Sequence, residues 1–207
     1  EEQVPELGAE LARQARAEAE QAVRAGAAPG IEEALAAASA RKLRGARSEV
    51  IGRFYGDFFF WVNLAGVIIQ MFFVSRIFKY FGVRAALFVL PVISFGGYAA
   101  IGLVGGLAVL RLAKTAENAT DYSLQNTVKQ ALFLPTSREA KYKAKAAIDT
   151  FFVRFGDAAS AGIVAVGLHA LHFGPRAFAF VNVGLALVWI LLNVGIAREH
   201  RKMVRAD

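Results

Sequence analysis

The stretch PRAFAFVNVGLALVWILLNVGIA, residues 175–197, decides the class of fold. It contains one charged residue, Arg176, and apolar side chains fill most of the other positions. A helix of roughly 20 mostly apolar residues is long enough to cross the hydrocarbon core of a bilayer. The whole chain is 56% hydrophobic, which exceeds the share found in ordinary soluble domains. We therefore predict a helical membrane protein.

Four other stretches have the same character, although one of them is short and half polar. We expect that weakest stretch, which carries Asp121 and Lys129, to insert only beside the other helices. The sequence thus predicts an all-α fold, a polytopic membrane bundle of five transmembrane helices. The predicted spans are residues 54–75, 85–110, 119–134, 147–171 and 175–197.

The first fifty residues differ in composition from the rest of the chain. They are rich in Ala, Glu and Arg and contain no apolar run long enough to span a membrane. Leu11, Ala15 and Ala19 recur at helical spacing and predict an amphipathic helix. Gly and Pro at residues 26–30 predict a break, followed by a second helix that runs to Ala40. We predict three parts: an amphipathic extracytoplasmic segment (1–50), a transmembrane five-helix bundle (51–198) and a cytoplasmic basic tail (199–207).

Lys and Arg crowd three alternate segments, at residues 76–84, 138–145 and 198–205. Connections rich in Lys and Arg stay on the cytoplasmic side of a membrane, so these three segments are predicted to share that side. The net charge of +7 then reflects topology. A nucleic-acid site in the basic loop 138–145 is disfavoured, because this loop lies between two predicted spans.

Charged and polar residues recur every three to four positions from Lys114, just before the third span, to Lys129 within it, and they place one polar stripe on a helix. On the fourth span, Thr150, Arg154, Asp157 and Ser160 share a face in the same way. Charge inside a bilayer is costly and usually marks a substrate or ion path, so we predict that these two faces point at each other. The residues predicted for this substrate-binding or intramembrane charge network are Lys114, Glu117, Asp121, Gln125, Lys129, Arg154 and Asp157.

The sequence offers no set of residues for enzyme catalysis. There is no cysteine, which excludes a thiolate metal site and a cysteine nucleophile. His169 and His172 lack a third metal ligand nearby, and we interpret them as interface residues. Gly105 and Gly106 are expected inside an apolar helix, where a phosphate-binding loop is excluded. We therefore expect neither an enzyme nor a bound metal or cofactor.

Several segments between residues 54 and 198 resemble the ATP/ADP antiporter family, the nucleotide exchangers of plastids and intracellular bacteria, and more closely their free-living bacterial relatives. These segments are FYGDFFFWVN (54–63), VSRIFKYFG (74–82), DYSL (121–124), KQALFLP (129–135), KYKAKAAID (141–149) and RFGD (154–157).

The resemblance implies the major-facilitator architecture, with twelve helices in two related halves. The five predicted spans would be helices eight to twelve of the C-terminal half, and the amphipathic hairpin would stand in the external connection after helix seven. We therefore expect this chain to be part of a larger assembly in a bacterial inner membrane. Its partners would be the lipid bilayer, and the N-terminal half or other membrane subunits.

The resemblance also implies an antiporter for nucleotides or other organic anions, in which Lys129 and Arg154 bind the anion. Glu117, Asp121 and Asp157 would then serve as gating pairs or in proton coupling. Asp157, however, stands where these exchangers commonly have Lys in the sequence Arg-Leu-Gly-Lys, and Gln130 stands where they tend to have Glu.

An anion at position 157 repels phosphate, so a second interpretation stays open. The chain would then be a non-transporting scaffold or accessory subunit of a larger membrane protein complex. In that case Asp157 pairs with Arg154 on its own helix, or with Lys129 across the bundle. The ion pair then stabilises the fold and does not bind a substrate.

Overall fold

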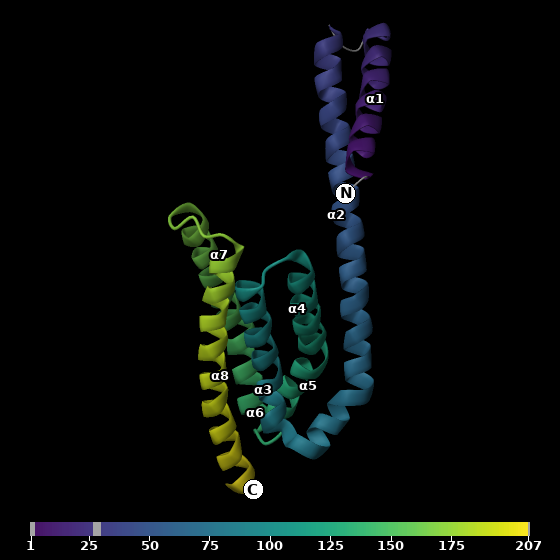
Figure 1. The fold of residues 1–207 in the computed structure, drawn as a ribbon. Coiled ribbons are helices and arrows are strands. Elements are labelled where there is room, and N and C mark those ends of the chain that lie inside the picture. Colours follow the sequence, from purple (N-terminus) through teal and green to yellow (C-terminus); the bar gives the residue numbers. More distant parts are fainter. Residues whose placement is uncertain (1–2, 27–29, 207) are drawn as a thin grey trace. The chain divides into compact units, whose positions relative to one another are not determined.

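The computed structural model describes residues 3–26 and 30–206, and every regular element in this part of the chain is a helix (Figure 1). The predicted all-α class is therefore confirmed. The chain forms two compact units, Glu1–Asp57 and Phe58–Asp207. Helix α2 (Ile31–Ile68) begins in the first unit and ends in the second. The three-part division made from the sequence stays a prediction.

The first unit pairs α1 (Gln3–Arg24) with the first half of α2 (Figure 1). Small side chains are buried on both helices, and they permit a close approach; these are Ala15, Ala19, Ala34 and Ala38. Glu18 of α1 forms ion pairs with Arg41 (4.0 Å) and Lys42 (3.6 Å) of α2. The predicted helix end at Ala40 is wrong, because residues 41–53 contain no Pro and are rich in helix-forming side chains. The predicted breaker Pro29 lies outside the described residues.

The second unit contains the predicted membrane segments. Three of its elements are single π-helical turns, in each of which the helix accommodates an extra residue. In chain order after α2 the elements are η1 (Ile69–Phe73), α3 (Val74–Leu103), α4 (Leu107–Thr120), η2 (Asp121–Gln125), α5 (Asn126–Leu132), α6 (Arg138–Ala147), η3 (Ile148–Phe152), α7 (Val153–His169) and α8 (Pro175–Ala206).

The boundary between the second and third predicted spans is wrong. The structure ends α3 at Leu103 and begins α4 at Leu107, so the third helical segment starts well before residue 119. Gly105 and Gly106 make the turn between them, with φ angles of 75° and 87°. Only glycine adopts such angles readily, which explains why the chain reverses here and not after residue 110. The expectation that these two glycines lie inside a helix is therefore also wrong.

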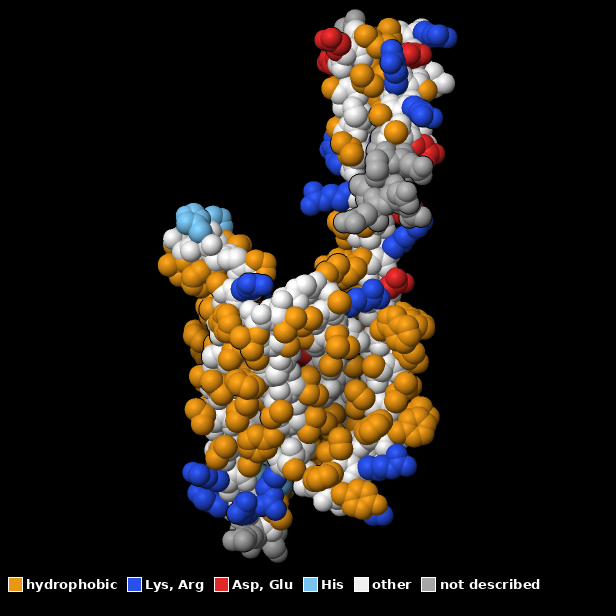
Figure 2. Space-filling model, in the orientation of Figure 1, with side chains coloured by type: hydrophobic (Ala, Val, Ile, Leu, Met, Phe, Trp, Pro, Cys, Tyr) orange, Lys and Arg blue, Asp and Glu red, His pale blue; other side chains and the backbone are white. Residues whose placement is uncertain are grey.

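Three stretches of the described residues are long and apolar enough to cross a membrane: Ile31–Leu103, Arg138–His169 and Pro175–Val204. The first is broken at Gly82 (φ 76°) and contains the first predicted span and most of the second. Hydrophobic side chains cover much of the surface of this unit in Figure 2. The chain is thus an integral membrane protein, while the count of five spans, which requires the more polar α4–η2–α5 segment, stays a prediction.

Helix α3 forms the centre of the second unit, with α8 on one side and α4 on another. Glycines on α3 bring its neighbours close. An added Cβ at Gly97 would lie 3.1 Å from Ala113 Cβ of α4, and one at Gly102 would lie 3.0 Å from the ring of Phe180 on α8. The apolar cluster Val74, Ala86, Leu87, Leu124 and Val128 is buried between α3 and the η2–α5 segment.

Candidate functional site

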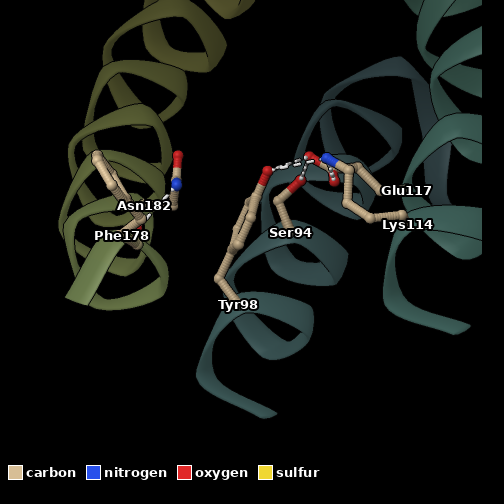
Figure 3. A network of polar contacts seen from close by, with 6 residues as sticks. All are labelled: Ser94, Tyr98, Lys114, Glu117, Phe178 and Asn182. Carbon is tan, nitrogen blue, oxygen red and sulfur yellow. Dashed lines mark hydrogen bonds and ion pairs between the residues drawn. The ribbon is translucent and has the colours of Figure 1, made fainter. Parts of the chain in front are cut away.

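A polar network joins α3 to α4 inside the second unit (Figure 3). Lys114 Nζ lies 2.6 Å from Glu117 Oε2 in an ion pair, and also donates to the hydroxyl of Tyr98 at 3.0 Å. Glu117 Oε1 accepts hydrogen bonds from Ser94 (3.1 Å) and Tyr98 (3.4 Å). Asn182, also drawn in Figure 3, lies on α8 and donates to the carbonyl of Phe178 in its own helix.

This network shields its charges from the surroundings. The Glu117 side chain keeps 19% of its exposure and the Lys114 side chain 34%. Partial burial makes the pair depend on its hydrogen bonds, because a charge removed from water must be compensated by its partners. The sequence stripe included Lys114 and Glu117 but not Ser94 and Tyr98. Their polar groups recur four positions apart on an apolar helix, and that spacing was the available signal.

Asp121 and Lys129 form a second, looser ion pair, with 3.6 Å between Lys129 Nζ and Asp121 Oδ1. Eight residues along a regular α-helix would turn Lys129 about 80° away from Asp121. The π turn η2, which begins at Asp121, takes up one extra residue and brings the two within about 20° of each other. Their side chains are 42% and 59% exposed. The pair is therefore accessible from outside the helix bundle.

Gln125, predicted for the same stripe, is buried at 4% exposure. Its side-chain oxygen has no hydrogen-bond partner in the described part of the chain. The predicted stripe thus contains a tight pair, a loose pair and a buried amide. The single charge network proposed for these residues stays a prediction.

Arg154 and Asp157 lie on α7, where every residue from 153 to 166 is exposed. Among the described residues, neither Arg154 nor Asp157 makes a hydrogen bond or an ion pair. The structure pairs Lys129 with Asp121 and shows no pairing of Asp157 with Lys129 or with Arg154. No hydrogen bond or ion pair therefore joins the α7 face to Lys129 in the described part of the chain, and the meeting of the two faces stays a prediction.

A polar cleft of about 340 Å³ lies between the α2–η1 segment and the η2–α5 segment, a volume within the range of small-molecule sites. Side-chain amides and hydroxyls line much of it, at Asn63, Gln70, Tyr122, Asn126 and Thr127. Three of these are carboxamides without a hydrogen bond in the described chain, and unsatisfied amides are costly next to lipid. Lys129 stands three positions after Asn126, on the same helical face. The spacing of residues in the sequence did not predict this cleft.

Comparisons with known proteins bear on this arrangement. Residues 100–200 match the family described as TLC ATP/ADP transporter. The matched region contains both ion pairs of α4–α5 together with Arg154 and Asp157. The resemblance to ATP/ADP transporters, inferred from the sequence, is confirmed.

Individual relatives agree with the family match. The ADP,ATP carrier protein 1 of Chlamydia pneumoniae is 30% identical over 129 residues, which cover 52% of this chain and 25% of the relative. The carrier of the same name from Chlamydia trachomatis is 27% identical over 123 residues, covering 50% of this chain and 23% of the relative. The matched stretch thus spans about a quarter of the length of these carriers. No solved structure matches the chain significantly.

Proposed function

We propose that this chain is part of a membrane antiporter that exchanges ATP for ADP across a bacterial inner membrane. The observation that carries the proposal is the family match of residues 100–200, because this region holds the cations and acids predicted for a substrate path. The names of the similar carriers favour nucleotides over other organic anions. They also favour transport over catalysis. Alternating access requires a second helical half opposite this one, which is the partner we expect.

In this proposal Arg154 and Lys129 meet the phosphates of the nucleotide. A guanidinium binds phosphate through two parallel hydrogen bonds, and a lysine ammonium binds it as a point charge. Arg154 has no partner among the described residues, and Lys129 is held only by the 3.6 Å contact to Asp121. Exposed charge on a membrane helix is costly in lipid, so we expect both side chains to face a water-filled path.

A phosphate of the arriving substrate would displace Asp121 from its ion pair with Lys129. An exposed ion pair is worth at most about 1 kcal/mol, so an arriving phosphate can take Lys129 from Asp121 at little cost. The Lys114–Glu117 pair is shorter and less exposed, and its bonds to Ser94 and Tyr98 tie α4 to α3. We propose that it gates the path by holding these two helices together. The polar cleft at Asn63 and Asn126 would accommodate the uncharged part of the nucleotide.

Asp157 has a different task in this proposal. It follows Arg154 by three positions on α7, so the two side chains share a face. Its negative charge lowers the positive potential at Arg154 and weakens phosphate binding there. We propose that Asp157 serves in gating or in proton coupling, in which release of a tightly held anion matters as much as its capture.

Exchange in proteoliposomes tests the proposal. Vesicles containing the full-length protein and loaded with ADP should take up labelled ATP, and Arg154→Gln should lower the exchange rate by about tenfold or more through lost charge-assisted bonds. Arg198→Gln, the same change at an exposed position of α8 outside the site, is the matched control. Absence of nucleotide exchange by the wild-type protein would overturn the antiporter proposal. Unchanged exchange by correctly inserted Arg154→Gln protein would remove Arg154 from the substrate path.

A further inference from the structure

A second cleft lies at the far end of the same unit, where the break of α3 at Gly82 meets the last two turns of α8. Its volume is about 260 Å³, and it is lined by Gly82, Val83, Arg84, His200, Arg201 and Val204. The positive φ of Gly82 (76°) turns the backbone here and sets Arg84 beside the end of α8. Two of the three basic segments of the sequence therefore meet in one cleft.

The polar groups of this cleft have no partner within the described chain. Arg84 and Arg201 are exposed and make no hydrogen bond or ion pair with a described residue. The Nδ1 atom of His200 is buried without a hydrogen-bond partner. Glu199, the acidic residue next to His200, is already paired with Lys202 at 2.6 Å. The cleft thus has a surplus of positive charge and an unsatisfied buried nitrogen, which together call for an anionic ligand with acceptor oxygens.

The position of the cleft restricts the ligand further. Arg84 stands directly before the apolar part of α3, and His200 and Arg201 follow the apolar stretch 175–197 of α8. Both groups therefore lie where membrane-spanning helices reach the headgroup layer. In Figure 2, Lys and Arg side chains gather at this lower end of the unit, below the hydrophobic surface. Val83 and Val204 add apolar side chains to the lining.

We propose that this cleft binds the phosphate group of an anionic phospholipid. Arg84 and Arg201 contact the phosphate oxygens, His200 Nδ1 supplies a further hydrogen bond, and the acyl chains extend along Val83 and Val204. Basic pockets between membrane helices are suited to such headgroups, because charge and apolar surface lie side by side. A free phosphate ion would satisfy the guanidinium groups but leave the two valines without a partner. The inference does not depend on nucleotide transport.

The test measures lipid binding to the full-length protein in detergent, by native mass spectrometry and by the shift in Tm. The probes are phosphatidylglycerol, phosphatidylcholine and inorganic phosphate. We expect phosphatidylglycerol to bind about tenfold more tightly than phosphatidylcholine and to raise Tm, whereas inorganic phosphate at the same concentration has little effect. The variant Arg84→Gln/Arg201→Gln should lose that preference. The control Arg138→Gln/Lys141→Gln removes the same net charge at positions that do not line the cleft and should keep it.

Three results would overturn the inference. Equal binding of the two lipids by the wild-type protein excludes an anionic-lipid site, and this arm needs no variant to fold. Protection by inorganic phosphate equal to that by phosphatidylglycerol assigns the cleft to a soluble anion. Equal losses in the two double variants show a general effect of net charge. The milder Arg84→Lys/Arg201→Lys variant, which keeps the charge, should retain most of the preference for phosphatidylglycerol.

Discussion

The side-chain amide of Asn193, on α8, donates a hydrogen bond of 2.8 Å to the backbone carbonyl of Leu87, on α3. In a regular helix that carbonyl would accept from the N–H four residues later, but residue 91 is proline and has no N–H. Asn193 is 1% exposed, so water does not reach this site. One buried amide thus compensates a proline in a neighbouring membrane helix and joins the two helices at the same point.

Replacing Asn193 by alanine should therefore destabilise the protein by about 1–2 kcal/mol, because the Leu87 carbonyl is left buried without a donor. Unfolding of the purified protein in detergent, followed by loss of helical circular dichroism, measures the change. Asn182→Ala is the matched control, since Asn182 bonds only to the Phe178 carbonyl of its own helix.

Replacing Pro91 shows whether Asn193 compensates for the missing proline N–H. In a Pro91→Ala background the alanine N–H is available to Leu87, so Asn193→Ala should cost about 1 kcal/mol less than it does in the wild type. If the two changes are additive in a double-mutant cycle, Asn193 does not compensate Pro91. The cycle uses the same unfolding measurement on all four proteins.

The Lys114–Glu117 pair gives a second stability prediction. Glu117→Ala leaves the Lys114 ammonium without its carboxylate and should cost about 2 kcal/mol, less than a fully buried pair because Lys114 keeps part of its exposure. Neutralising both residues, as Lys114→Met/Glu117→Gln, should recover much of the loss. An equal or larger loss in the double variant would show that the hydrogen bonds to Ser94 and Tyr98, and not the charges, hold α3 to α4.

The sequence was sufficient for the class of fold but not for the grouping of the polar residues. Apolar length predicts membrane helices, and helical spacing assigned Asp121 and Lys129 to one polar stripe. A regular α-helix does not bring this pair together, however, since the π turn at η2 supplies the missing rotation. Such turns leave no pattern in the spacing of residue types. The burial of Gln125 depends on the packing of neighbouring helices, and the spacing of residues in the sequence does not predict that packing.

The ends of the helices were also predicted incorrectly from the sequence. Gly105 and Gly106 were interpreted as small residues inside a span, because small side chains also serve close helix packing, as Gly97 and Gly102 do. Composition does not separate these two uses of glycine. The backbone does, since only the first pair has positive φ angles.

Asp121→Asn tests the proposed role of the loose ion pair. Removal of the carboxylate frees Lys129, so the affinity for ATP should rise by up to about fivefold, which corresponds to the 1 kcal/mol of an exposed pair. Release of the bound nucleotide should slow, and the maximal exchange rate should fall. Equilibrium binding and exchange in proteoliposomes measure the two effects separately. A lower affinity would show that Asp121 supports Lys129 and does not compete with the substrate.

The orientation of the second unit is tested by cysteine labelling in intact cells. The chain has no cysteine, so a single introduced thiol in this region can be assigned without background from it. Ser137→Cys lies at the start of the basic helix α6 and is expected to be protected from an impermeant thiol reagent, because basic connections stay in the cytoplasm. Ala25→Cys, at the end of α1, is expected to react.

Permeabilised cells provide the control for this experiment, because both thiols should then react if both are exposed as the structure shows. Reaction at Ser137→Cys together with protection at Ala25→Cys would invert the orientation derived from the basic segments. Reaction at both positions in intact cells would place them on the same side. An odd number of spans must then be lost between them, and the more polar α4–η2–α5 segment is the first candidate, since it is absent from the three stretches that are apolar enough to cross a membrane.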